Sequence, residues 1–145
     1  MYHYLEGGLE NVWLVNGYKV RKTPYGKAVA IEDVEGLHRS IAEKLVDKPG
    51  PLVRQEFRFL RKELGLSQRA LGAILGAEEQ AIARWERGVS KIDQMAARFL
   101  RALYREHRHG KARIRQMVER LNALDEVENA KITCKRDKMD WKVAA

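Results

Sequence analysis

Glycine residues divide the middle of the chain into short amphipathic stretches. Gly65, Gly76 and Gly88 separate four such stretches, in which apolar residues recur every three or four positions. This spacing predicts short helices, and a glycine after a helix supplies the positive φ with which many helices end. The middle of the chain is therefore restricted to packed short helices joined by tight turns, which we place over residues 51–108.

Each predicted helix has one apolar stripe that would face a common core. Ser67 and Asp93 are suited to cap the second and fourth helices, because their side-chain oxygens accept hydrogen bonds from free amide groups. The four stripes are Phe57, Leu60 and Leu64; Ala70, Leu71, Ile74 and Leu75; Ile82 and Trp85; and Ala96, Phe99, Leu100 and Leu103.

Residues 1–50 predict a small α+β unit, a candidate dimer or partner interface. Strands are expected over residues 11–15, 18–22 and 28–31, with the turn signal Asn16-Gly17 between the first two. A helix is expected over residues 34–47, and the sequence Lys48-Pro49-Gly50-Pro51 after it predicts a short, stiff linker.

The C-terminal segment, residues 109–145, predicts one more helix and a hairpin. The helix carries the stripe Ile114, Met117, Val118 and Leu121, which would either close the core or form a dimer seam. Residues 131–143 alternate weakly and predict a hairpin around Arg136-Asp137-Lys138. The expected fold is mainly α, with a small α+β N-terminal unit and a five-helix core.

Positive charge is concentrated in the middle of the chain. Residues 52–120 contain 16 Lys and Arg against 8 Asp and Glu, whereas residues 1–51 (7 against 7) and 121–145 (5 against 5) are balanced. The whole net charge of +8 therefore belongs to one segment. Such a concentration favours a polyanion-binding surface, and the alternative is a solvated basic face without a partner.

Several function classes are disfavoured by what the sequence lacks. The lone Cys134 leaves no internal disulfide, no run approaches the ~20 apolar residues of a membrane span, and the N-terminus lacks a signal sequence. His107 and His109 diverge on a helix end, and no phosphate loop or hydrolytic constellation is present. We expect a cytoplasmic protein that is no enzyme and has no metal, cofactor or catalytic residues.

Residues 67–88 have the pattern of a helix-turn-helix motif. Two short helices flank Gly76, and Ile82 and Trp85 would turn one side of the second helix inward. In this motif the second helix lies in the major groove of DNA and presents its outer side chains to base edges. The outer, base-contacting residues are then Glu79, Gln80, Ala83 and Arg84.

Particular motifs resemble known families. Leu66-Ser67-Gln68, Leu75-Gly76 and Ile82-x-Arg84-Trp85-Glu86-x-Gly88 resemble the lambda-repressor-like (Xre/Cro) helix-turn-helix family over about residues 54–106. The front of the chain resembles MqsA/HigA-type antitoxins through Tyr2-His3-Tyr4, Asn11-Val12-Trp13-Leu14, Asn16-Gly17-Tyr18 and Val34-Glu35-Gly36-Leu37-His38. The chain departs from members with a zinc module, because it lacks their paired CxxC motifs. Glu78 also stands where a Ser or Thr cap is usual, although its carboxylate could still cap the helix.

The resemblance implies roles for individual residues. Arg84 would donate two hydrogen bonds to guanine, and Gln80 would read adenine. Glu79 would either accept from a cytosine amino group or repel phosphates. By the resemblance, Gln68 would contact a backbone phosphate and brace the second helix; Arg69, Arg87 and Lys91 would contact backbone phosphates because they flank the motif. The resemblance also implies a structural ion pair between Arg61 and Glu86.

Together these patterns predict a sequence-specific DNA-binding transcriptional repressor. It would be dimeric and autoregulatory, and it would bind a palindromic operator in double-stranded DNA through the major groove. Two alternatives remain open, namely an antitoxin that neutralises a partner toxin by protein–protein binding, and a phage or mobile-element regulator.

Overall fold

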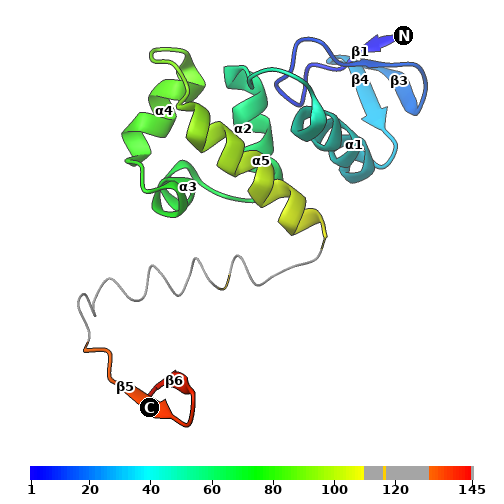
Figure 1. The fold of residues 1–145 in the computed structure, drawn as a ribbon. Helices are drawn as coiled ribbons and strands as arrows, with labels where there is room; N and C mark the ends of the chain where they lie inside the picture. Colours follow the sequence, from blue (N-terminus) through cyan, green and yellow to red (C-terminus); the bar gives the residue numbers. More distant parts are fainter. Residues whose placement is uncertain (110–115, 117–130, 145) are drawn as a thin grey trace. The chain divides into compact units, whose positions relative to one another are not determined.

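The computed structural model describes residues 1–109, 116 and 131–144, in two units that comprise residues 1–114 and 115–145. The first unit holds strands β1 to β4 and helices α1 to α5, and the second holds β5 and β6 (Figure 1). The expected domain boundary near residue 50 lies inside the first unit, where one core joins the front of the chain to the helices that follow.

Two antiparallel ribbons form the front of the chain. β1 (Tyr2–His3) pairs with β2 (Trp13–Leu14), and β3 (Tyr18–Thr23) pairs with β4 (Gly26–Ile31). The hairpin expected around Asn16-Gly17 is therefore wrong. Gly17 does turn the chain, with φ of 79°, but the strand after it pairs with β4. The six-residue register of β3 and β4 allows a longer hydrogen-bonded ladder than the two residues of β2 could provide.

Helix α1 (Val34–Asp47) has the bounds that the sequence predicts, and it belongs to the main core. The Asp33 carboxylate caps it by accepting from the Gly36 amide at 3.1 Å. Ala42, Leu45 and Val46 are buried, and α1 packs against both α2 (Arg54–Glu63) and α5 (Gln94–Arg108). The front of the chain is thus held to the later helices by apolar contacts.

The expected series of short helices is present in α2, α3 (Gln68–Leu75), α4 (Glu79–Arg87) and α5. Ser67 caps α3 by accepting from the Ala70 amide at 3.0 Å, and Asp93 caps α5 by accepting from the Met95 amide at 2.9 Å. Gly76 and Gly88 end α3 and α4 with positive φ, as the glycine spacing predicts.

The core lies where α1, α2 and α5 meet the helix pair α3 and α4. Its largest fully buried side chains are Phe57, Leu60, Leu64, Leu71, Ile82 and Leu100. Phe99 departs from the expected stripe of α5, because its side chain is 46% exposed while Ala97 and Tyr104 are buried. On a helix with about 100° per residue, Phe99 lies roughly 100° from the middle of the buried face. Ala70, Ile74 and Leu75 are half-buried.

In the second unit, β5 (Cys134–Asp137) pairs with β6 (Asp140–Val143), which confirms the expected C-terminal hairpin. The helix expected around Ile114 to Leu121 lies outside the described residues. Among the helices that the structure describes, none is long and apolar enough to cross a membrane.

Candidate nucleic-acid interface

The turn between α3 and α4 depends on two glycines. Gly76 adopts φ of 69°, a left-handed conformation that side chains other than glycine rarely adopt. Gly72 lies inside α3, and a Cβ atom added there would be 2.6 Å from the Ala77 carbonyl oxygen. The Gly72 carbonyl also accepts from the Ala77 amide at 2.9 Å. The angle between the two helices thus requires a residue without a side chain at position 72. The only sequence signal for this close approach is a glycine within an apolar helix.

A buried ion pair anchors α4 to α2. The Arg61 guanidinium donates from Nε to Glu86 Oε2 at 2.7 Å and from Nη2 to Glu86 Oε1 at 2.8 Å, so the contact is bidentate. The side chains are only 9% and 3% exposed. A third donor of Arg61, Nη1, reaches the Leu66 carbonyl at 2.8 Å. The ion pair that the resemblance implied is therefore confirmed, and it also holds the chain segment between α2 and α3.

Gln68 connects the start of α3 to this anchor. Its Nε2 donates to Glu86 Oε1 at 3.2 Å, and the residue is half-buried. An amide nitrogen carries two hydrogens, so one donor of Gln68 braces α4 and a second is left for another acceptor.

Helix α4 has a buried side and an exposed side. Ile82 is fully buried, and the Trp85 ring packs edge to face against Phe57 with ring centroids 5.9 Å apart. Trp85 is half-buried and packs against the core. The exposed side brings the sequence-predicted residues together: Glu79, Gln80 and Arg84 are exposed and Ala83 is half-buried. Glu78 occupies the cap position of α4, but its side chain makes no capping hydrogen bond.

Cations flank the exposed side of α4. Arg69 in the first turn of α3, Arg87 at the end of α4 and Lys91 in the loop after it are all exposed. Arg54, which the sequence analysis missed, donates from Nη1 to the Arg87 carbonyl at 3.1 Å and lies against Gly88. A lone exposed arginine at a helix start gives no sequence signal for such a contact.

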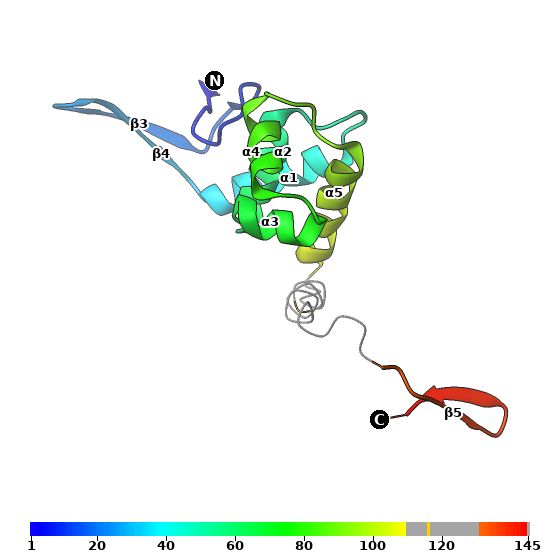
Figure 2. The same cartoon turned by 90° about the vertical axis from the view of Figure 1, so that its left-hand side faces the viewer.

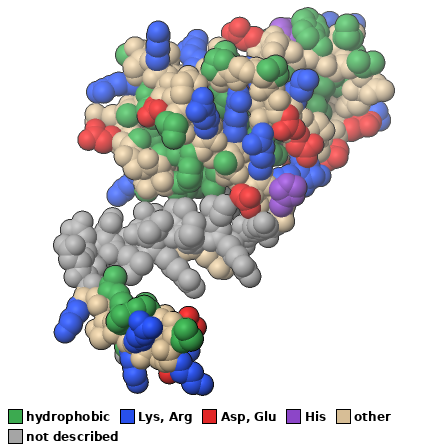
Figure 3. All heavy atoms as spheres, viewed as in Figure 1, with side chains coloured by type: hydrophobic (Ala, Val, Ile, Leu, Met, Phe, Trp, Pro, Cys, Tyr) green, Lys and Arg blue, Asp and Glu red, His purple; other side chains and the backbone are tan. Residues whose placement is uncertain are grey.

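Much of the positive charge of α5 serves the fold instead. Arg105 donates to the Val46 carbonyl in the last turn of α1 at 3.1 Å, and Arg101 donates to the Gly50 carbonyl in the loop after α1 at 2.7 Å. Arg108 pairs with Glu43 at 2.9 Å. Such cations complement the negative end of a helix dipole. On the face of the first unit that carries α5, Figure 3 shows Lys and Arg side chains with Asp and Glu side chains beside them. The basic excess of residues 52–120 is therefore only partly available to a polyanion.

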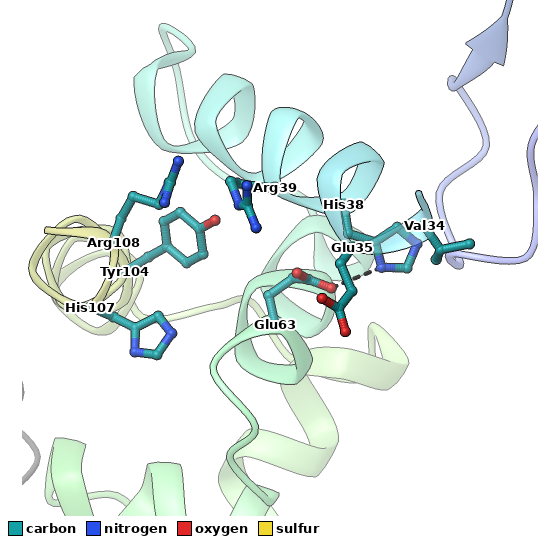
Figure 4. Close-up of a pocket in the computed structure, with 8 residues that line it drawn as sticks. All are labelled: Val34, Glu35, His38, Arg39, Glu63, Tyr104, His107 and Arg108. Carbon is teal, nitrogen blue, oxygen red and sulfur yellow. Dashed lines mark hydrogen bonds and ion pairs between the residues drawn. The ribbon is translucent and has the colours of Figure 1, made fainter. Parts of the chain in front are cut away.

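A hollow of about 420 Å³ lies between α1, α2 and α5, away from α4 (Figure 4). His38 is at one side of it, hydrogen-bonded from Nδ1 to Glu63 Oε1 at 2.9 Å and through Nε2 to the Tyr4 hydroxyl at 2.6 Å. His38 thus joins Tyr4, next to β1, to helices α1 and α2. Burial raises the pKa of Tyr4, the partner of His38, and the pKa of Tyr104, which lines the hollow. His107 also lines the hollow, and no cluster of metal-ligating side chains occurs in the part of the chain that the structure describes.

Residues 57–105 match the family model described as helix-turn-helix (HTH_3), which spans the segment from α2 to α5. No curated protein and no solved structure matches the chain. The match leaves out the front of the chain, so its MqsA/HigA-type resemblance stays a prediction, as does the five-helix lambda-repressor-like core. By this match and by its geometry, the chain carries an Xre-like helix-turn-helix domain, the kind with which transcription regulators bind DNA.

Proposed function

We propose that this protein is a sequence-specific transcriptional repressor that binds an operator through α4 and regulates its own promoter. The observation that carries the proposal is the two-sided α4, whose inner side is locked by the Arg61–Glu86 pair while its outer side presents polar residues. A rigidly held helix can keep its outer side chains in one register against base edges.

The outer residues offer a set of complementary base contacts. Arg84 is suited to guanine O6 and N7, Gln80 to adenine N6 and N7, and the Ala83 methyl group to the thymine methyl. Glu79 is suited to the cytosine amino group. Gln68, Arg69, Arg87 and Lys91 would hold the phosphates on either side and position the helix without reading sequence.

Dimerisation follows from the small size of this helix. One nine-residue helix provides few base contacts, and a two-fold dimer doubles them on a palindromic site. Exposed apolar side chains on α5 support the same conclusion, since Met95 is 69% and Phe99 46% exposed, four positions apart on one side of the helix.

The proposal is tested by fluorescence anisotropy with the native upstream duplex and a shuffled duplex, each at two salt concentrations. We expect preferential binding to the native duplex that persists at the higher salt. Arg84→Ala should weaken binding to the native duplex by about 1–3 kcal/mol and leave shuffled DNA nearly unaffected. Arg39→Ala on α1 is the matched control, because it removes an exposed arginine from another helix. Equal binding of parent and Arg84→Ala to the native duplex would refute the assignment of α4 as the reading helix.

A further inference from the structure

The hairpin of the second unit exposes its apolar side chains and has a free edge. In the part of the chain that the structure describes, β5 and β6 pair only with each other, and they form one narrow ribbon (Figure 2). Trp141 is 67% exposed and Val143 72%. An isolated two-stranded hairpin is at best marginally stable in water, and a stable sheet needs three or more strands or a packing partner. A further strand would therefore stabilise this hairpin.

The register of the hairpin places like charges opposite one another on one face. Lys135 lies opposite Lys142, and Asp137 lies opposite Asp140. Directly opposed like charges destabilise an antiparallel pair. A diagonal contact between Lys142 Nζ and Asp137 Oδ2, at 4.0 Å, offsets this only in part, because both side chains are more than half exposed. Since side chains alternate between the faces of a strand, Trp141 lies on the other face.

The hydrogen bonds of β6 to β5 decide which backbone groups reach the free edge. The Ala144 amide donates to the Thr133 carbonyl at 2.7 Å, which continues the ladder by one directly opposed pair. Hydrogen-bonded and non-hydrogen-bonded pairs alternate along an antiparallel ladder. Lys142 and Asp140 are therefore bonded to β5, whereas Trp141 directs its amide and carbonyl groups to the outer edge. Such an edge is a ready template for a strand of another chain.

We propose that β6 pairs antiparallel with β6 of a second copy of this chain, so that two hairpins form one four-stranded sheet. This inference rests on the dimer of the proposed function and names a surface that forms it. With Trp141 opposite the partner's Trp141, a two-fold axis passes between the two side chains. The same register sets Asp140 of each copy opposite Lys142 of the other. One aromatic pair and two attractive charge pairs then form across the new edge.

The alternation of the ladder fits this register. Trp141 would exchange both backbone hydrogen bonds with the partner's Trp141, because its amide and carbonyl groups face the outer edge. The flanking pairs are then of the non-hydrogen-bonded type, in which opposed side chains lie closest. Asp140 and the partner's Lys142 would therefore meet at short range. Each of them lies opposite a like charge within its own hairpin, so the pairing also offsets that repulsion.

Other registers are less favourable. A two-fold axis at Lys142 or Asp140 would set like charges of the two β6 strands against each other. An axis at Lys135 or Arg136 would do the same for two β5 strands, and an axis at either end residue of β5 would overlap the strands by one residue only. A shift by one residue would turn the apolar face of one copy to the polar side of the other. Pairing of β5 with a partner's β6 would leave free edges and continue into open assemblies.

The test is the monomer–dimer equilibrium of the full chain, measured by sedimentation equilibrium at micromolar concentrations. Asp140→Lys sets lysine against lysine across the new edge, and Lys142→Asp sets aspartate against aspartate. Each variant should raise the dimer Kd by about tenfold, because two attractive pairs become repulsive. Within its own hairpin each variant removes an opposed like-charge pair, so hairpin stability alone predicts an unchanged or lower Kd. A Kd no higher than that of the parent, for either variant, would overturn the proposal.

Combining the two substitutions tests the register itself. An equimolar mixture of Asp140→Lys chains and Lys142→Asp chains should restore the Kd of the parent, because every lysine at the edge of one chain then lies opposite an aspartate of the other. The double variant, with both changes in one chain, has the net charge of the parent and should dimerise like it. If neither the mixture nor the double variant dimerised better than the single variants, the register would be refuted.

Lys135→Asp on β5 is the matched control. It makes the same change of charge as Lys142→Asp and removes the same opposed lysine pair, but position 135 does not lie on the pairing strand. We expect a dimer Kd no higher than that of the parent. An increase as large as that of Lys142→Asp would show that net charge is the cause, and the proposal would fail.

The pairing of β6 and the proposed function can fail separately. Two four-residue strands form a small contact beside the ~1,200–2,000 Å² that stable interfaces bury, so we expect the pairing to act together with the exposed side of α5 in one dimer. If the parent were a monomer, both the pairing and the proposed dimer would fail, and Arg84→Ala would still decide the assignment of α4. If Phe99→Glu gave a monomer while the β6 variants dimerised like the parent, only the pairing would fail. The converse result would support the pairing and exclude α5.

Discussion

Glu86→Gln should be among the most damaging single substitutions in this protein. The change keeps the size of the side chain but removes the charge that compensates the Arg61 guanidinium. Both side chains are nearly fully buried, at 9% and 3% exposure, so solvent provides little screening. Breaking a buried pair from one side costs about 3–5 kcal/mol, because an uncompensated charge is left in the interior. Of the two charge-assisted hydrogen bonds, at 2.7 and 2.8 Å, one is lost because the amide nitrogen can only donate, and the other loses the charge of its acceptor.

The assay is equilibrium unfolding in urea, followed by helical circular dichroism. A loss of about 3–5 kcal/mol is a large share of the 5–15 kcal/mol by which domains are usually stable. The informative companion is the double variant Arg61→Met with Glu86→Leu. Replacing both charges with apolar groups should recover most of the lost stability, since neither charge then remains buried. The reasoning would be refuted if Glu86→Gln cost less than about 1 kcal/mol, or if the double variant were less stable than the single one.

Three further predictions concern the packing of other parts of the first unit. Gly72→Ala should destabilise the fold despite the better helix propensity of alanine, because the new Cβ would lie 2.6 Å from the Ala77 carbonyl oxygen. Thermal unfolding of the variant should show a lower Tm than that of the parent, and a higher Tm would contradict the clash. Phe99→Glu should convert a dimer to a monomer in sedimentation experiments with little change in Tm, and a persistent dimer would exclude this side of α5 as the interface. Tyr4→Phe should reduce the loss of stability above about pH 10. Because the pKa of Tyr4 is raised in the folded state, the unfolded state loses this proton first, and the free energy of unfolding falls as pH rises. Identical alkaline unfolding profiles of the parent and the variant would contradict this.

The helix-turn-helix segment was predictable because its signals are local. Caps such as Ser67 and Asp93 act on amides two or three residues away, and Gly76 and Gly88 end helices through their own backbone conformation. The apolar stripes repeat within one or two helical turns. The Arg61–Glu86 pair spans a longer distance in the chain, and it was anticipated only through the resemblance of the surrounding motif.

The pairing of the front strands could not be read from one sequence. Asn16-Gly17 is a strong turn signal, but a turn signal indicates a change of direction and leaves the identity of the pairing strand open. β3 had two available neighbours, and the longer ladder with β4 decided the outcome. That choice also sets Lys22 directly opposite Lys27 across the two strands.

The sequence by itself determined the bounds of α1, the caps that begin α3 and α5, the glycines that end α3 and α4, and which side of α4 faces outward, because those features depend on residues a few positions apart. The tertiary structure decided what distant residues do for one another: Arg105 binds the end of α1 and Arg101 the loop after it, His38 joins Tyr4 to Glu63, and Phe99 stays exposed. The reason is physical. The periodicity of a helix or strand indicates whether a residue faces inward or outward. The partner that the residue contacts depends on which helices and strands pack together, and that is a property of the whole fold.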